Sequence, residues 1–93
     1  MINFEIVPTE KLVKLAISNI RLYSTAVANH VKYMRYTAEV KMSVLERHYF
    51  DMNLYGDCVD ILLREIESRN AEVPACYMKQ YLYNMDKRES ILN

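Results

Sequence analysis

The segment from Thr9 to Tyr55 contains neither glycine nor proline. Strand-rich folds place those two residues in their many tight turns, whereas a long stretch without them is typical of helix. The whole chain of 93 residues has one Gly and two Pro, against an average usage of about 7% and 5%. The sequence therefore predicts one small domain, residues 1–93, of the all-α class, and excludes sandwiches and barrels.

Apolar side chains within this segment recur with the period of a helix. On a wheel of about 100° per residue they fall in one arc that keeps its phase. We call this arc the long stripe; it consists of Val13, Ala16, Ile20, Val27, Val31, Met34, Ala38, Met42, Leu45, Tyr49 and Met52. It predicts a single helix over about residues 9–54, which would be roughly 68 Å long at 1.5 Å per residue. A compact chain of this size has a radius of gyration of only about 12 Å, so one chain could not cover such a helix.

We therefore expect a helical homodimer in which a second copy covers the long stripe. The residues predicted for self-association are Val13, Ile20, Val27, Val31, Met34, Met42, Leu45, Tyr49 and Met52. The alternative is that the helix is broken near residues 29–37, where helix propensity is lower.

Shorter elements complete the predicted fold. The run Tyr55-Gly56-Asp57 predicts a turn, because Gly suits the end of one helix and Asp suits the cap of the next. We expect two shorter helices, over about residues 58–69 and 75–85. Alternating apolar and polar residues predict an extended arm at residues 1–8. Residues 86–93 form a polar tail that either extends the last helix or frays.

Charge is balanced over the chain but unevenly distributed. Lys plus Arg and Asp plus Glu each total 12. Residues 1–47 hold seven bases and four acids, and residues 48–93 hold five bases and eight acids, so the halves carry net charges of +3 and −3. A dipolar chain can neutralise itself by folding or by pairing. This weakens the case for a protein that coats nucleic acid.

Five basic residues and no acidic ones lie between Glu10 and Glu39. Four of them fall within about 60° on the helical wheel and form a basic stripe. The basic stripe consists of Lys14, Arg21, Lys32 and Arg35, with Tyr33 and Tyr36 beside it. We predict that it binds a protein target with an acidic surface, the alternative being a solvated helix face. Reversing the charges of Arg21 and Lys32 should then abolish target binding and leave helicity intact.

Residues 57–85 faintly resemble a helix-turn-helix, in which the second helix of the motif presents polar side chains to DNA. The resemblance implies a small dimeric DNA-binding regulator, with Lys79, Gln80 and Tyr83 as possible contacts or with a basic helix on phosphates. The match departs from the motif because Ala71-Glu72 stands where the turn glycine is usual. A plain helical hairpin is the alternative.

The sequence contains no motif for catalysis or for metal binding. His30 and His48 would lie about 27 Å apart on a straight helix, too far to share a metal ion. His48 with Cys58 and Cys76 lacks the ligand spacing of a zinc site. We therefore expect no enzyme, no cofactor and two reduced thiols. No segment approaches about 18 uninterrupted apolar residues, so we expect a cytoplasmic protein with no membrane partner.

Eight Tyr and six Met suit a binding surface, because both side chains adapt to a partner. The sequence thus predicts a small non-enzymatic protein-binding regulator that inhibits or recruits a larger target. In style it resembles the small accessory proteins of bacteriophages and mobile elements that block a host protein. The alternatives are the DNA-binding regulator described above and a structural oligomer or assembly factor.

Overall fold

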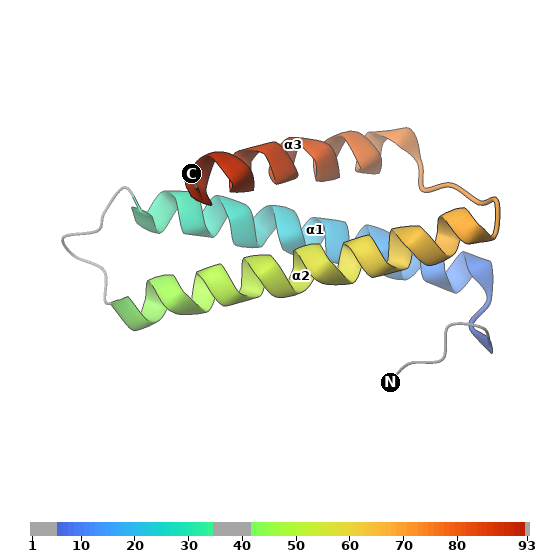
Figure 1. The fold of residues 1–93 in the computed structure, drawn as a ribbon, viewed down its shortest axis with the longest axis horizontal. Helices are drawn as coiled ribbons and strands as arrows, with labels where there is room; N and C mark the ends of the chain where they lie inside the picture. Colours follow the sequence, from blue (N-terminus) through green and yellow to red (C-terminus); the bar gives the residue numbers. More distant parts are fainter. Residues whose placement is uncertain (1–5, 35–41, 93) are drawn as a thin grey trace.

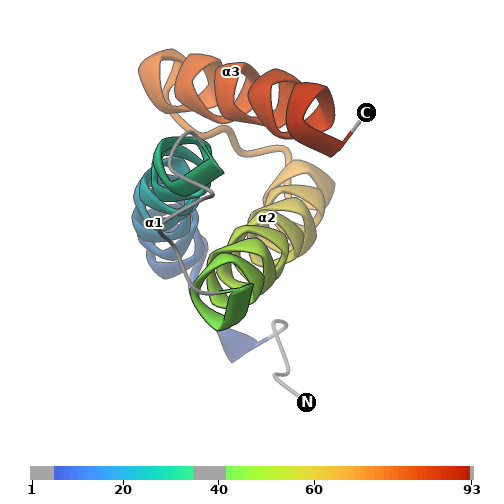
Figure 2. The same cartoon turned by 90° about the vertical axis from the view of Figure 1, so that its left-hand side faces the viewer.

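The structure, a computed structural model, describes residues 6–34 and 42–92, without the side chains at positions 33, 34, 42, 43, 45, 91 and 92. It consists of three helices, α1 (Thr9–Met34), α2 (Met42–Ser68) and α3 (Ala75–Leu92). Figure 1 shows α1 and α2 side by side and antiparallel, with α3 packed along them, and Figure 2 shows the bundle turned by 90°. The described residues contain no strand. The prediction of an all-α fold is confirmed.

The long stripe is folded back on itself. Since α1 ends at Met34 and α2 begins at Met42, the prediction of one helix over residues 9–54 is wrong and the alternative of a break near residues 29–37 is confirmed. Both halves of the stripe contribute to one core, Ile20 and Val27 from α1 and Met52 from α2. Closing a short connection costs only loop entropy, whereas a dimer also loses the free translation and rotation of a second chain.

The hydrophobic core lies mainly between α1 and α2. Its largest fully buried side chains are Leu12, Ile20, Tyr23, Val27, Met52, Val59 and Ile66. Val73 and Tyr81 add to it from the connection after α2 and from α3.

Three residues predicted for self-association, Ile20, Val27 and Met52, are fully buried within a single chain. Val13 and Val31 are half-buried and Tyr49 is 43% exposed. The side chains of Met34, Met42 and Leu45 lie outside the described residues. The centre of the long stripe is therefore core, and it is not a surface on which a second copy can dock.

α2 runs without a break through Gly56, so the predictions of a turn at residues 55–57 and of a separate helix over 58–69 are wrong. Gly56 is buried. A Cβ atom there would lie 3.0 Å from Cε1 of Tyr23 and 2.8 Å from Nη1 of Arg88. The missing side chain lets neighbouring helices approach α2 closely. In the sequence, a glycine in this role looks the same as a glycine at the end of a helix.

The end of α2 is a Schellman motif built on Asn70. This residue has a φ of 56°, in the left-handed region that Asn tolerates better than most residues. The N–H of Ala71 donates to the carbonyl of Ile66 at 3.1 Å, and the N–H of Asn70 donates to the carbonyl of Glu67 at 3.0 Å. Pro74 then accepts the first hydrogen bonds of α3.

α3 packs chiefly on α1 and makes few contacts with α2. The rings of Tyr23 and Tyr81 lie 5.6 Å apart, and Nδ2 of Asn84 donates to Oγ of Ser24 at 2.9 Å. The tail predicted at residues 86–93 extends the helix almost to its end, which is one of the two outcomes expected for it.

Arg69 ties the end of α2 to the start of α1. Its Nη1 donates to the carbonyl of Val7 at 2.6 Å and to Oγ1 of Thr9 at 3.3 Å, and its Nε donates to Oε1 of Glu65 at 3.1 Å. Most of the extended arm predicted at residues 1–8 lies outside the described residues, and its last three residues form no strand.

Candidate binding groove

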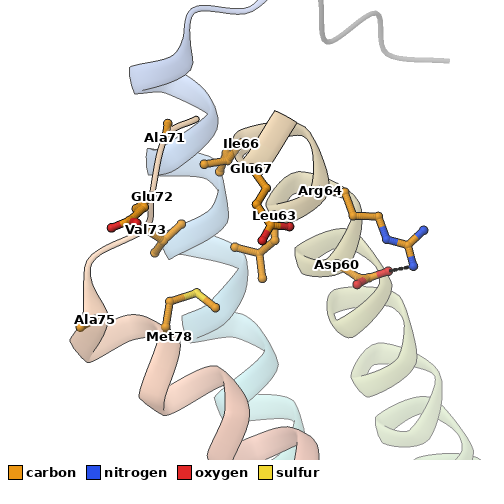
Figure 3. A pocket seen from close by; sticks show the side chains of 10 residues that line it. All are labelled: Asp60, Leu63, Arg64, Ile66, Glu67, Ala71, Glu72, Val73, Ala75 and Met78. Atoms are coloured by element: carbon orange, nitrogen blue, oxygen red, sulfur yellow. Dashed lines mark ion pairs between the residues drawn. The ribbon is translucent and has the colours of Figure 1, made fainter. Parts of the chain in front are cut away.

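A groove opens between the end of α2, the connection that follows it and the start of α3 (Figure 3). It forms because α3 packs on α1 and leaves this part of α2 uncovered. Its volume is about 560 Å³. Pockets of roughly 300–1,000 Å³ accommodate drug-sized ligands, so the groove has room for one or two large side chains.

The inner surface of the groove is apolar. Ile66 and Val73, 2% and 6% exposed, form its floor. The half-buried side chains of Leu63, Ala71 and Met78 stand around them. Because these three side chains already pack against the core on one side, an apolar ligand would complete their burial. The flexible thioether of Met78 suits partners of different shape.

Carboxylates dominate the rim of the groove. Asp60, Glu67 and Glu72 lie there with a single base, Arg64. Nη2 of Arg64 is 3.0 Å from Oδ2 of Asp60, as the dashed line in Figure 3 marks, so these two charges offset each other. Glu67 and Glu72 are exposed and leave the rim negative. A groove of this kind attracts an apolar group that carries positive charge beside it.

A polar junction joins the three helices further along α2. Arg88 of α3 donates from Nη2 to Oδ1 of Asn53 on α2, and Asn84 donates to Ser24 on α1. The hydroxyl of Tyr23 is buried there without a hydrogen-bond partner among the described residues. Burial raises the pKa of Tyr23, and Arg88 acts in the opposite direction. The junction fixes the position of α3 and so shapes the groove.

The basic stripe is not an open row of cations. Nζ of Lys14 is 3.5 Å from Oε1 of Glu10, with both side chains well exposed. Nη2 of Arg21 donates to the hydroxyl of Tyr77 on α3 at 3.1 Å, and its guanidinium lies 5.5 Å from the centroid of that ring. Lys32 is exposed. The side chains of Tyr33, Arg35 and Tyr36 lie outside the described residues.

The residues predicted for DNA contact, Lys79, Gln80 and Tyr83, are exposed on one side of α3. Lys87 joins them, with Nζ 5.4 Å from the ring centroid of Tyr83. The helix packing differs from a helix-turn-helix, however, because α3 packs chiefly on α1 and makes few contacts with α2. The helix before the connection is also long, with 27 residues.

The remaining candidate groups are dispersed. His30 is 7% exposed, its ring centroid lies 5.9 Å from that of Tyr49, and its Nδ1 has no partner among the described residues. Cys58 is half-buried, Cys76 is exposed, and both are free thiols. In the described part of the chain no three His, Cys, Asp or Glu side chains are placed to hold a metal ion.

No described helix combines the length and apolar character needed to cross a membrane.

The groove could not be recognised from the sequence, because its apolar residues have the spacing of core positions. Leu63 and Ile66 are three residues apart, the spacing of one face of a helix, and Met78 is an apolar residue of the next helix. The one sequence feature that pointed to the groove was the excess of acidic residues near the end of α2. These residues can be recognised as the rim of a groove only once the packing of α3 is known.

No protein-family model, no curated protein and no solved structure matches the chain, so the function is argued from geometry.

Proposed function

We propose that this chain is a small non-enzymatic protein-binding regulator whose groove holds an apolar side chain from a basic segment of a larger target. The observation that supports the proposal is the open groove of about 560 Å³ with an apolar floor and a carboxylate rim. Binding at this groove inhibits or recruits the target.

Apolar burial supplies most of the affinity in this proposal. Fully burying a Leu or Phe side chain contributes about 1.5–3 kcal/mol. Lys or Arg residues on either side of it would lie near Glu67 and Glu72, where opposite charge speeds association and fixes orientation. One contact of this size gives weak, reversible binding unless the target adds further contacts, and reversibility suits a regulator.

The basic stripe supports a different partner for the same class of function. A target with an acidic surface needs accessible cations, and Arg21 in the middle of the stripe is already held by Tyr77. We therefore favour the groove. The acidic target is the alternative that the following experiment separates from it.

Panning a random peptide display library against the purified chain tests the proposal. We expect the enriched peptides to carry a large apolar residue flanked by Lys or Arg. They should lose binding to Met78→Lys, which puts a like charge into the groove. Ala75→Lys, at an exposed lining position, is a milder second variant in case the first does not fold. Fluorescence anisotropy measures binding and circular dichroism checks helicity.

Ala28→Lys, on the exposed side of α1, is the matched control and should bind the peptides as the wild type does. Peptides that bind folded groove variants equally well would overturn the groove. Acidic peptides that fail to bind the Arg21→Glu/Lys32→Glu variant would support the basic stripe instead. Binding of duplex DNA that weakens steeply with salt would support the DNA-binding alternative.

A further inference from the structure

The outward side of α2 carries an apolar stripe that no described residue covers. Phe50, Leu54 and Ile61 are 63%, 44% and 51% exposed, and at about 100° per residue they lie within about 40° of one another. We call these three residues the α2 stripe. It lies on the side of α2 opposite the buried Met52 and Val59. Aligned exposed apolar residues form a patch, whereas scattered ones do not.

The charges beside the α2 stripe are arranged in a self-complementary way. Glu46 and Arg64 lie on one flank at the same helical angle, about five turns apart. Arg47 and Glu65 lie on the other flank with the same separation and the opposite order of charge. Each flank therefore has an acid at one end and a base at the other.

We propose that the α2 stripe is a homodimer interface in which the α2 helices of two copies pair antiparallel. A two-fold axis near Gly56 makes the two surfaces identical, so that each contact occurs twice. Phe50 of one copy then meets Ile61 of the other. On the flanks, an antiparallel pair brings like flanks together.

The charges agree with this arrangement. Glu46 of one copy lies opposite Arg64 of the other, and Arg47 lies opposite Glu65, so all four flanking pairs of the dimer join opposite charges. Within its own chain Arg64 already pairs with Asp60 and Glu65 with Arg69, so the dimer contacts share these charges and add only modest affinity. A parallel pair would place Glu46 beside Arg47 of the second copy, which also joins opposite charges, so the flanking charges alone do not choose the orientation. We favour the antiparallel pair because it opposes the helix macrodipoles.

The dimer is weak and depends on concentration. The interface has three apolar residues per copy, and its flanking charges extend over about 28 Å of helix between positions 46 and 65. Its buried area is therefore at the small end of the range for specific interfaces. Asp57 is exposed at the edge of the α2 stripe, close to the two-fold axis. The Asp57 carboxylates of the two copies would therefore lie near each other, and their repulsion lowers the affinity of the dimer further. The three apolar residues of the α2 stripe do not line the groove, whereas Arg64 belongs to both surfaces. The dimer does not depend on the proposed function.

Sedimentation equilibrium of the full chain with a reductant present tests the proposal. We expect a weight-average mass that rises with concentration from 11.0 kDa towards twice that value. Leu54→Glu, in the middle of the α2 stripe, should remain monomeric. Leu22→Glu is the matched control, because Leu22 is 46% exposed on α1, and this variant should associate as the wild type does. A wild-type chain that stays monomeric at every concentration, or a dimer that survives Leu54→Glu, would overturn the interface.

A charge exchange tests the orientation. Glu46→Arg and Arg64→Glu should each weaken the dimer about three- to tenfold in Kd, because each creates two like-charge contacts. The double variant, Glu46→Arg/Arg64→Glu, should restore the wild-type Kd in an antiparallel pair. In a parallel pair it would remain weakened, and that result would overturn the proposed arrangement.

Discussion

The ring of Tyr23 on α1 packs against the backbone of Gly56 on α2 so closely that a Cβ atom at position 56 would lie 3.0 Å from its Cε1. The ring is fully buried, and Tyr81 of α3 lies 5.6 Å from it on another side. The contact is therefore made where all three helices meet. The single glycine of the chain determines how closely helices cross, and Asn70 determines where α2 ends.

Gly56→Ala should destabilise the chain although alanine is the better helix former. At an exposed helix position the change stabilises by about 0.5–1 kcal/mol. Here the new Cβ meets the buried ring of Tyr23, and we expect a net loss of about 1–3 kcal/mol in the free energy of unfolding. Urea unfolding followed by circular dichroism measures this loss. Asp57→Ala, at the next and exposed position, is the control and should change stability little; a gain in Gly56→Ala would contradict the packing.

Stability should fall in mild acid because of His30. Burial, with a smaller contribution from His48, lowers the pKa of His30 from its usual 6.5. The unfolded chain then binds a proton at a higher pH than the folded chain, so stability is full above about pH 6.5 and declines as the pH drops below that value. The urea midpoint measured from about pH 7.5 to pH 5 shows this decline.

His30→Phe keeps an aromatic ring beside Tyr49 and should flatten the acid decline. His48→Gln should retain most of it, because desolvation of His30 is the larger cause. Equal slopes in the wild type and His30→Phe would show that another group is responsible.

Tyr81 should produce a second decline in strong base. Burial, followed by the charge of Asp60, raises the pKa of Tyr81 to about 12. Stability is therefore unaffected by this group below about pH 10, where the hydroxyl is protonated in both states, and is lost as the pH rises from 10 towards 12. Tyr81→Phe should reduce the loss, with a smaller slope left from Tyr23. Tyr83→Phe, at a site 62% exposed, is the control and should behave as the wild type.

The Asn84 to Ser24 hydrogen bond should couple α3 to α1. Asn84 is 6% exposed and donates to Ser24 Oγ at 2.9 Å. In a double-mutant cycle with Ser24→Ala and Asn84→Ala, we expect a coupling of about 0.5–1.5 kcal/mol in the free energy of unfolding. The cycle is read from four urea titrations. A coupling near zero would mean that the two residues hold α3 independently.

The helical class and most helix faces could be predicted from residue spacing, because local periodicity reports which residues share a side. Ile20, Val27 and Met52 were correctly placed on one apolar arc. The arc itself does not show whether its two halves cover each other or cover a second copy, and this choice depends on loop closure. The prediction of a turn at Gly56 failed for a related reason. A turn and a close helix crossing both favour a residue that has no side chain, so the glycine alone does not tell them apart.

The candidate site was less accessible to sequence reasoning. Leu63 and Met78 have the spacing of core residues, and they line a groove only because α3 rests on α1. Arg21 was predicted to be free for a partner, whereas Tyr77, distant in sequence, holds it. Such pairings depend on where α3 docks, and no local pattern encodes that position.

The uneven attachment of α3 also affects how the chain is made. Ser24 and Tyr81 belong to opposite ends of the sequence, so a growing chain can pair α1 with α2 before α3 has left the ribosome. Synthesis proceeds at about 5–20 residues per second, and for that interval the face of α1 that receives α3 is exposed. The connection of residues 69–74 then brings α3 back onto that face of α1.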